Sequence, residues 1–256
     1  MRKWLYIIFL VLAGIGLSYG DEPLTPRTPK LFFDDGLYLY SSPFHLNRDN
    51  YKTPLVFGSI IVGSSLLDST IRNHLVAWSD STPARNLRKL GDFAQMSGPV
   101  VGTLVGIHGW AADNDKSKET AYLSYETFLW AGAIESTVKY VVGRERPFKT
   151  ANSYSFIPFS GNYSFPSGHT TEAFAAATVF SEQYPHWYVY VPSYGIAASV
   201  GYSRLYANQH WFSDVVAGAI IGTSVSHILR KRHRHPKDYS WSLESNGSDI
   251  RLVKRF

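Results

Sequence analysis

Six long apolar stretches with helical spacing constrain this chain more than any other feature of its sequence. They cover residues 53–77, 86–111, 119–143, 168–184, 187–203 and 211–232. Between residues 53 and 232 no long run alternates apolar and polar residues, as a half-buried strand would. A chain of 256 residues suits one domain with a sizeable core. The sequence therefore predicts an all-α fold, a bundle of six helices.

The first 20 residues are typical of an export signal. Two basic residues, at positions 2 and 3, precede the uncharged apolar run Leu5–Leu17, and small residues follow at 18 and 20. The run is shorter than the about 20 apolar residues that a membrane span needs. We expect residues 1–20 to be a removed signal peptide, with an uncleaved anchor as the alternative. Either way, residue 21 and those after it would lie outside the cytoplasm.

Three further segments complete the expected organisation. Residues 21–52 contain four prolines and six aromatic residues, which predicts an extended segment docked on the core. Residues 53–235 form the helical domain, and within it residues 144–167 are a long loop of the kind that often carries function. Residues 236–256 are expected to be a loosely ordered tail.

Composition excludes several classes of function. Cysteine is absent, so disulfides, cysteine nucleophiles and thiolate metal sites are ruled out. Seven of the 25 basic residues lie in the leader or within residues 230–237, and the remaining 18 nearly balance the 20 acidic residues. The net charge of +5 therefore belongs to the two ends of the chain, and a nucleic-acid-binding surface is not indicated.

Two short stretches gather cations and backbone donors. Lys139 and Arg146 are seven residues apart, nearly two helical turns, so both point the same way if the helix runs that far. Ser167, Gly168 and His169 directly precede an alanine-rich helical run. They would occupy a helix N-terminus, where free N–H groups and the helix dipole favour an anion.

A third stretch places a carboxylate near a histidine. Arg204 is followed by His210 and then by Asp214 at the start of the last predicted helix. A spacing of four residues allows the carboxylate to hydrogen-bond the imidazole, fixing its tautomer and favouring its use as a nucleophile. Cations and preorganised donors are what phosphoryl transfer requires, and a second histidine can protonate the leaving oxygen. The sequence therefore predicts a phosphate-ester site.

The stretches "KYVVGRERP", "FPSGH" and "SRLYANQHWFSD" resemble the three-part signature of the type 2 phosphatidic acid phosphatase and vanadium haloperoxidase superfamily. The resemblance covers roughly residues 120–230 and implies the helical bundle of that superfamily, with a long active-site loop. It also implies that hydrolysis needs no metal or other cofactor, and that vanadate inhibits competitively. The implied phosphate ligands are Lys139, Arg146, Ser167, Gly168 and Arg204, and the implied general acid, nucleophile and orienting carboxylate are His169, His210 and Asp214.

The superfamily contains both soluble exported enzymes and integral membrane enzymes. A mean hydropathy of −0.14 argues against a chain made mostly of spans. A six-span arrangement with the site outside would also start residue 53 inside, whereas the leader places residue 21 outside. We therefore expect an exported domain of the periplasm or cell envelope, which could rest on a membrane surface. The alternative is an integral inner-membrane protein with an outward-facing site.

The function expected from these observations is a phosphatase for monoesters, either a lipid phosphate or diphosphate or a small ester, acting through a phosphohistidine. Two alternatives stay open. One is a vanadate-dependent haloperoxidase, because the pocket that holds phosphate can also hold vanadate. The other is an envelope protein that binds phosphate or lipid without catalysis.

Overall fold

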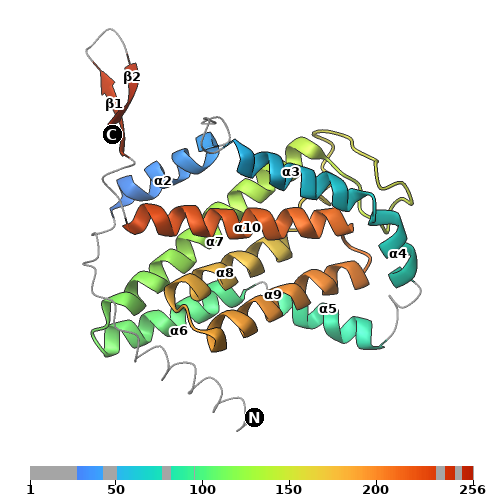
Figure 1. Cartoon of the computed structure of the whole chain (residues 1–256), viewed down its shortest axis with the longest axis horizontal. Helices are drawn as coiled ribbons and strands as arrows, with labels where there is room; N and C mark the ends of the chain where they lie inside the picture. The colour runs from blue at the N-terminus through green and yellow to red at the C-terminus, as the bar shows by residue number, and fades with distance from the viewer. Residues whose placement is uncertain are drawn as a thin grey trace.

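The computed structural model describes residues 28–42, 51–76, 82–94, 96–234, 240–245 and 250–255. Over these residues the chain is a helical bundle, as Figure 1 shows, and the predicted all-α class is confirmed. The helices are α2 (Pro29–Ser41), α3 (Lys52–Ser65), α4 (Asp68–Val76), α5 (Thr82–Ala94), α6 (Ser97–Ala111), α7 (Asp115–Val142), α8 (Gly168–Gln183), α9 (Trp187–Tyr206) and α10 (Phe212–Arg234). The predicted signal peptide lies outside the described residues.

The described residues contain more helices than the six that were predicted. The last four predicted helices are confirmed as α7 to α10, but each of the first two is broken. The stretch 53–77 becomes α3 and α4, whose axes differ by 48°. Ser64 and Ser65 precede this break, and their hydroxyls donate to the carbonyls of Ile61 and Val62, a pattern that bends helices. The second break precedes Pro99, which fits the first turn of α6 but not a helix interior.

The prediction that residues 21–52 are extended is wrong for residues 29–41, which form α2. The prolines bracket this helix instead of breaking it. Thr28 is its N-cap and accepts a hydrogen bond from the N–H of Leu31 at 3.3 Å. Pro29 occupies the first turn, where its missing N–H costs nothing, and Pro43 follows the helix in the sequence.

The C-terminal tail also has more order than the sequence analysis expected. Strands β1 (Ser240–Ser245) and β2 (Ile250–Arg255) pair antiparallel, with Ser240 opposite Arg255 and Ser245 opposite Ile250. The alternation of Trp241 and Leu243 with serines is the local pattern that allows this hairpin. It is too short to have outweighed the polar composition of the tail.

Helix α8 is the centre of the bundle and packs against α6, α7, α9 and α10. Its buried surface is built from small residues, among them Ala173, Ala175 and Ala177. Facing it on α10, Gly222 has no room for a side chain, since a Cβ there would lie 2.1 Å from the carbonyl oxygen of Thr171. This close packing fixes the N-terminus of α8 against that of α10, where two of the three signature stretches lie.

The outer faces of α3, α6 and α9 are strongly apolar. Trp110 on α6 is 81% exposed and Leu55 on α3 is 62% exposed. The exposed apolar residues are Leu55, Val56, Ile60 and Val62 on α3, Val100, Leu104, Ile107 and Trp110 on α6, and Trp187, Tyr188, Tyr190, Val191, Ile196 and Tyr202 on α9. By length and composition, α10 could cross a membrane, and α3 with α4 could form a second span if the bent pair acts as one.

Candidate active site

The three signature stretches meet at one end of the bundle. In Figure 1 this is the end where the loop of residues 143–167 lies beside α4. The N–H of Ser167, at the start of α8, donates to the carbonyl of Asp214 in the first turn of α10, at 3.0 Å. The guanidinium of Arg146 donates to the amide oxygen of Gln209, next to His210, at 2.6 Å. These contacts join the first and second stretches to the third.

Lys139 lies in the last turn of α7, which ends at Gly143 in a left-handed conformation, with a φ of 58°. The helix therefore stops before Arg146, which extends from the loop and not from the face of α7, as the sequence analysis had considered. The ammonium group of Lys139 contacts the carboxylate of Glu135 at 2.5 Å. It also lies against Gly168, where a Cβ would come within 2.8 Å of Nζ. Glycine at the start of α8 thus lets the lysine approach the helix N-terminus.

His210 lies in the short connection between α9 and α10 and is buried. Its Nδ1 is 2.7 Å from the carbonyl oxygen of Ser164. A carbonyl only accepts, so Nδ1 carries the proton and Nε2 keeps its lone pair. Burial lowers the pKa of His210 below 6.5; Asp214 opposes this, and Arg146 and Lys139 add to it. The neutral imidazole with a free Nε2 is therefore the favoured form.

Asp214 does not hydrogen-bond His210 directly, as its spacing had suggested. Its Oδ2 lies 3.7 Å from Nδ1 of His210, because His210 precedes the helix and is not on its face. Oδ2 instead accepts from the Ser164 hydroxyl at 2.6 Å and from the Trp211 N–H at 2.8 Å. The second contact is the helix-capping bond of a third-position acid. Asp214 therefore acts on His210 through Ser164, whose carbonyl accepts the hydrogen bond from Nδ1 of the imidazole.

Arg204 and His169 share a partner that the sequence analysis missed. Asp92 on α5 lies 2.6 Å from the guanidinium of Arg204 and 3.2 Å from Nε2 of His169. Arg204 is buried, whereas Asp92 is 53% exposed. The carboxylate thus contacts one expected phosphate ligand, Arg204, and the expected general acid, His169. No local pattern marks Asp92 in the sequence, because α5 precedes the signature stretches and only the fold brings it to them.

Ser167 and Arg144 complete the surroundings. The hydroxyl of Ser167 lies 2.9 Å from that of Thr170, so this buried side chain is held at the start of α8. Arg144 falls inside the stretch "KYVVGRERP" but was assigned no role. It is buried and donates to Asp214 at 2.5 Å. Its position between Lys139 and Arg146 was the available signal.

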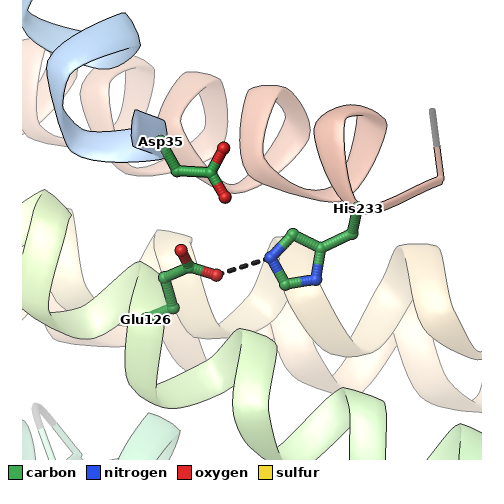
Figure 2. Close-up of side chains that lie close together, drawn as sticks. All are labelled: Asp35, Glu126 and His233. Atoms are coloured by element: carbon green, nitrogen blue, oxygen red, sulfur yellow. Dashed lines mark hydrogen bonds and ion pairs between the residues drawn. The ribbon is translucent and has the colours of Figure 1, made fainter. Parts of the chain in front are cut away.

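A separate cluster of ionisable side chains lies at the other end of α10, drawn in Figure 2. His233 contacts Glu126 at 2.5 Å, and Arg232 contacts Asp35 at 2.5 Å. Two carboxylates lie near His233, because α7 supplies Glu126 and α2 supplies Asp35. One candidate ligand atom from each of Asp35, Glu126 and His233 lies within 4.8 Å of the others, close enough for a metal ion. The guanidinium of Arg232 already lies beside Asp35 and balances its charge. We therefore interpret the cluster as an ion-pair network joining α2, α7 and α10.

Comparison with known families places the segment that carries the three signature stretches. The sequence pattern of the PAP2 superfamily matches residues 121–236, which contain all eight predicted site residues. The matched segment belongs to the PAP2 superfamily. The predicted resemblance is thereby confirmed, while Asp68 and Asp92, from α4 and α5, lie outside the matched segment.

Individual relatives agree with this assignment. A lipid A 1-phosphatase of Porphyromonas gingivalis is 40% identical over 119 residues, which are 44% of this chain and 24% of that protein. An undecaprenyl-diphosphatase of Sulfolobus acidocaldarius is 33% identical over 103 residues, 40% of this chain and 50% of that protein. This chain thus spans a quarter to a half of the length of these two relatives.

A solved structure supports the fold. The transmembrane PAP2 type phosphatidylglycerolphosphate phosphatase from Bacillus subtilis superposes with a TM-score of 0.50 at 18% identity. The match covers 79% of this chain and 94% of that one. At this identity the likeness establishes the shared helical architecture.

Proposed function

We propose that this PAP2 protein is a membrane-embedded phosphatase that removes phosphate from a lipid phosphate or diphosphate through a phosphohistidine at His210. The observation that carries the proposal is the hydrogen bond from Nδ1 of His210 to the carbonyl of Ser164. It leaves Nε2 as the nucleophile, at the end of the bundle where His169 and the three cations of the signature stretches gather.

In the first step, Nε2 of His210 attacks the phosphorus atom and the bond from phosphorus to the lipid oxygen breaks. His169 gives its proton to that oxygen. Arg146, Arg204 and Lys139 balance the charge on the phosphoryl oxygens, as phosphoryl transfer requires. The N–H groups of the first turn of α8 are oriented to bind the same anion.

In the second step, a water molecule attacks the phosphohistidine and the bond between nitrogen and phosphorus breaks. His169, now neutral, accepts the proton of the attacking water. Inorganic phosphate leaves and His210 returns to its starting form. The contact of Asp92 with Arg204 and His169 must open or shift when phosphate binds, because the phosphate oxygens need the same donors.

The outer surface and the relatives support the proposed substrate class. The exposed apolar faces of α3, α6 and α9 would be covered by lipid chains in a membrane. The two relatives above are named for lipid A and undecaprenyl diphosphate, both amphiphiles with a phosphate head. This supports the integral-membrane alternative over the exported soluble domain, with the site at the envelope-facing surface.

The test uses the full chain, extracted and purified in detergent. Phosphate release is measured from phosphatidic acid, undecaprenyl diphosphate, lipid A and a water-soluble aryl phosphate, each with EDTA and with and without vanadate. We expect EDTA-resistant, vanadate-sensitive release from at least one lipid. When the substrate carries radioactive phosphate, rapid quenching should trap labelled protein, and His210→Gln should give no labelled protein. Release of phosphate only from the aryl ester by protein that is soluble without detergent would refute the lipid assignment. Halide oxidation by peroxide on adding vanadate, without phosphatase activity, would refute the phosphatase.

A further inference from the structure

Behind Asp214, on the side away from His210, lies a buried arginine with two carboxylates. Arg144 donates from NH1 to Oδ1 of Asp214 at 2.5 Å and from NH2 to Oδ2 of Asp68 at 2.7 Å. Its remaining bonds go to the carbonyl of Ser153 in the long loop and to the hydroxyl of Ser213. Asp68 and Asp214 are fully buried and Arg144 is 1% exposed.

Asp68 holds the start of α10 from outside that helix. Its Oδ1 accepts from the N–H of Ser213 at 2.8 Å and its Oδ2 from the hydroxyl of Ser213 at 2.7 Å. These bonds satisfy one of the free N–H groups of the helix N-terminus and place negative charge there, where the dipole favours it. Ser213 directly precedes Asp214, so Asp68 fixes Asp214 both through the backbone and through Arg144.

Helix α4, which carries Asp68, also contacts the rest of the site. Arg72 donates from Nε and NH2 to the carbonyl of Pro147, directly after Arg146, at 3.2 and 3.0 Å. Its guanidinium lies 5.8 Å from the ring centre of Trp211. Asp68 and Arg72 line a small cavity together with His210 and Trp211. The whole of α4 lies outside the matched PAP2 segment.

We propose that Asp68 is a positioning residue for the reaction: through Arg144 and Ser213 it holds Asp214, and thereby Ser164 and His210, in the geometry of attack. The inference rests on the proposed function, since it assigns a role in that reaction. Asp68 touches no reacting atom. It acts through a chain of buried hydrogen bonds whose last member, the carbonyl of Ser164, sets the tautomer of His210.

A purely structural role for the pair of Asp68 and Arg144 predicts a different result. The chain also offers a matched control. Asp35 and Arg232 form another buried carboxylate–arginine pair, on α2 and α10, at the opposite end of the bundle. Asp35→Asn removes the same charge from the same kind of pair. If Asp68 only stabilises the fold, Asp68→Asn and Asp35→Asn should both lower thermal stability, and both variants should keep the wild-type kcat.

The experiment compares both variants with the wild type in detergent, using the best lipid phosphate substrate of the wild-type protein. We expect Asp68→Asn to lower kcat by about 10- to 100-fold, as for loss of one hydrogen bond to a charged group. KM should change less than about twofold, because Asp68 does not contact substrate. In an Asp214→Asn background the same change should cost less than about threefold, since the two residues act as a unit. Asp35→Asn should keep the wild-type kcat.

An activity-independent measurement separates this inference from the proposed function. The proton on Nδ1 of His210, shared with the Ser164 carbonyl, should give a downfield proton resonance that is absent in His210→Gln. We expect Asp68→Asn to shift or abolish it and Asp35→Asn to leave it. Wild-type kcat in Asp68→Asn, with an unshifted resonance, would overturn the inference. Absence of turnover by the wild-type protein on every substrate would instead overturn the proposed function.

A second variant covers the case in which Asp68→Asn does not fold. Ser213→Ala deletes only the hydroxyl that donates to Asp68, leaving both carboxylates and Arg144 in place. We expect a roughly three- to tenfold loss of kcat with KM unchanged, because only two bonds of the network are lost, the one to Asp68 and the one from Arg144. An unchanged kcat in a folded Ser213→Ala protein would count against the positioning role.

Discussion

The imidazole of His210 donates its Nδ1 proton to the main-chain carbonyl of Ser164, 2.7 Å away, and not to the carboxylate of Asp214, which is 3.7 Å away. The tautomer of the proposed nucleophile is therefore set by a backbone atom of the long loop. Asp214 acts one step further out, by accepting the hydroxyl of Ser164 at 2.6 Å. The loop and the helix thus share the task of orienting one ring.

Replacing His210 by Gln should abolish turnover. The glutamine amide has about the size of the ring and can keep a donor for the Ser164 carbonyl, but it has no basic nitrogen to attack phosphorus. We expect a loss of more than about 10³-fold in kcat with a melting temperature within a few degrees of the wild type. Radiolabelling after rapid quenching provides the second measurement. A variant that keeps a tenth of the activity would contradict the nucleophile assignment.

Asp214→Asn should have a smaller effect on rate and a larger effect on stability. The amide retains one acceptor, but the buried guanidinium of Arg144 loses one of the two carboxylates that balance its charge. We expect kcat to fall about 10- to 100-fold, less than in His210→Gln, and the protein to be destabilised by about 3 kcal/mol. Thermal unfolding followed by circular dichroism measures the second effect. A rate loss equal to that of His210→Gln would assign Asp214 a direct chemical step.

The sequence predicted the components of the site because each signature stretch is local. Each stretch can be recognised from residues that are close together in the sequence, as for Lys139, His169 and His210. Helices α7 to α10 are predicted by their apolar periodicity. What it could not predict are contacts between distant residues. Asp92 and Asp68 reach the site only because α5 and α4 fold back onto it, and no periodicity encodes that path.

The missed and broken helices have a similar cause. The prolines of residues 21–52 predict an extended segment, although Pro29 at the first turn is compatible with a helix. The breaks before α4 and α6 depend on serine hydroxyls and on where Pro99 falls within a turn. Such details change the length of a helix without changing its apolar pattern.

Removal of the Arg204 side chain should cost about 10²- to 10³-fold in kcat, by analogy with loss of one preorganised donor to a developing charge. The variant is Arg204→Ala, with Arg204→Lys as the comparison. Lysine restores the charge but cannot contact Asp92 and a phosphate oxygen with a planar fork, so partial recovery is expected. Steady-state kinetics on one lipid phosphate measure both. A loss below tenfold in Arg204→Ala would contradict its role as a phosphate ligand.

The pH dependence should follow the neutral form of His210. Burial lowers its pKa in the folded protein, so the acid limb of kcat/KM should have its midpoint below 6.5, the ordinary value. The unfolded chain binds a proton that folded His210 does not, and stability should therefore fall as pH drops below about 6.5. His210→Gln should lose less stability over that range. An acid limb with a midpoint above 6.5 would show that this histidine is not held neutral by burial.

The last prediction concerns the glycine at the start of α8. A Cβ on Gly168 would lie 2.8 Å from Nζ of Lys139 and 2.9 Å from Oε1 of Glu135, so Gly168→Ala must push the lysine away from the helix N-terminus. We expect kcat/KM to fall at least about tenfold, the loss of one charge-assisted bond to phosphate. Gly195→Ala on α9 is the matched control, because a Cβ there meets nothing within 4 Å. In a helix it should stabilise by about 0.5–1 kcal/mol and leave the rate unchanged. Equal kinetics in the two variants would mean that Lys139 does not need to contact the start of α8 to bind phosphate.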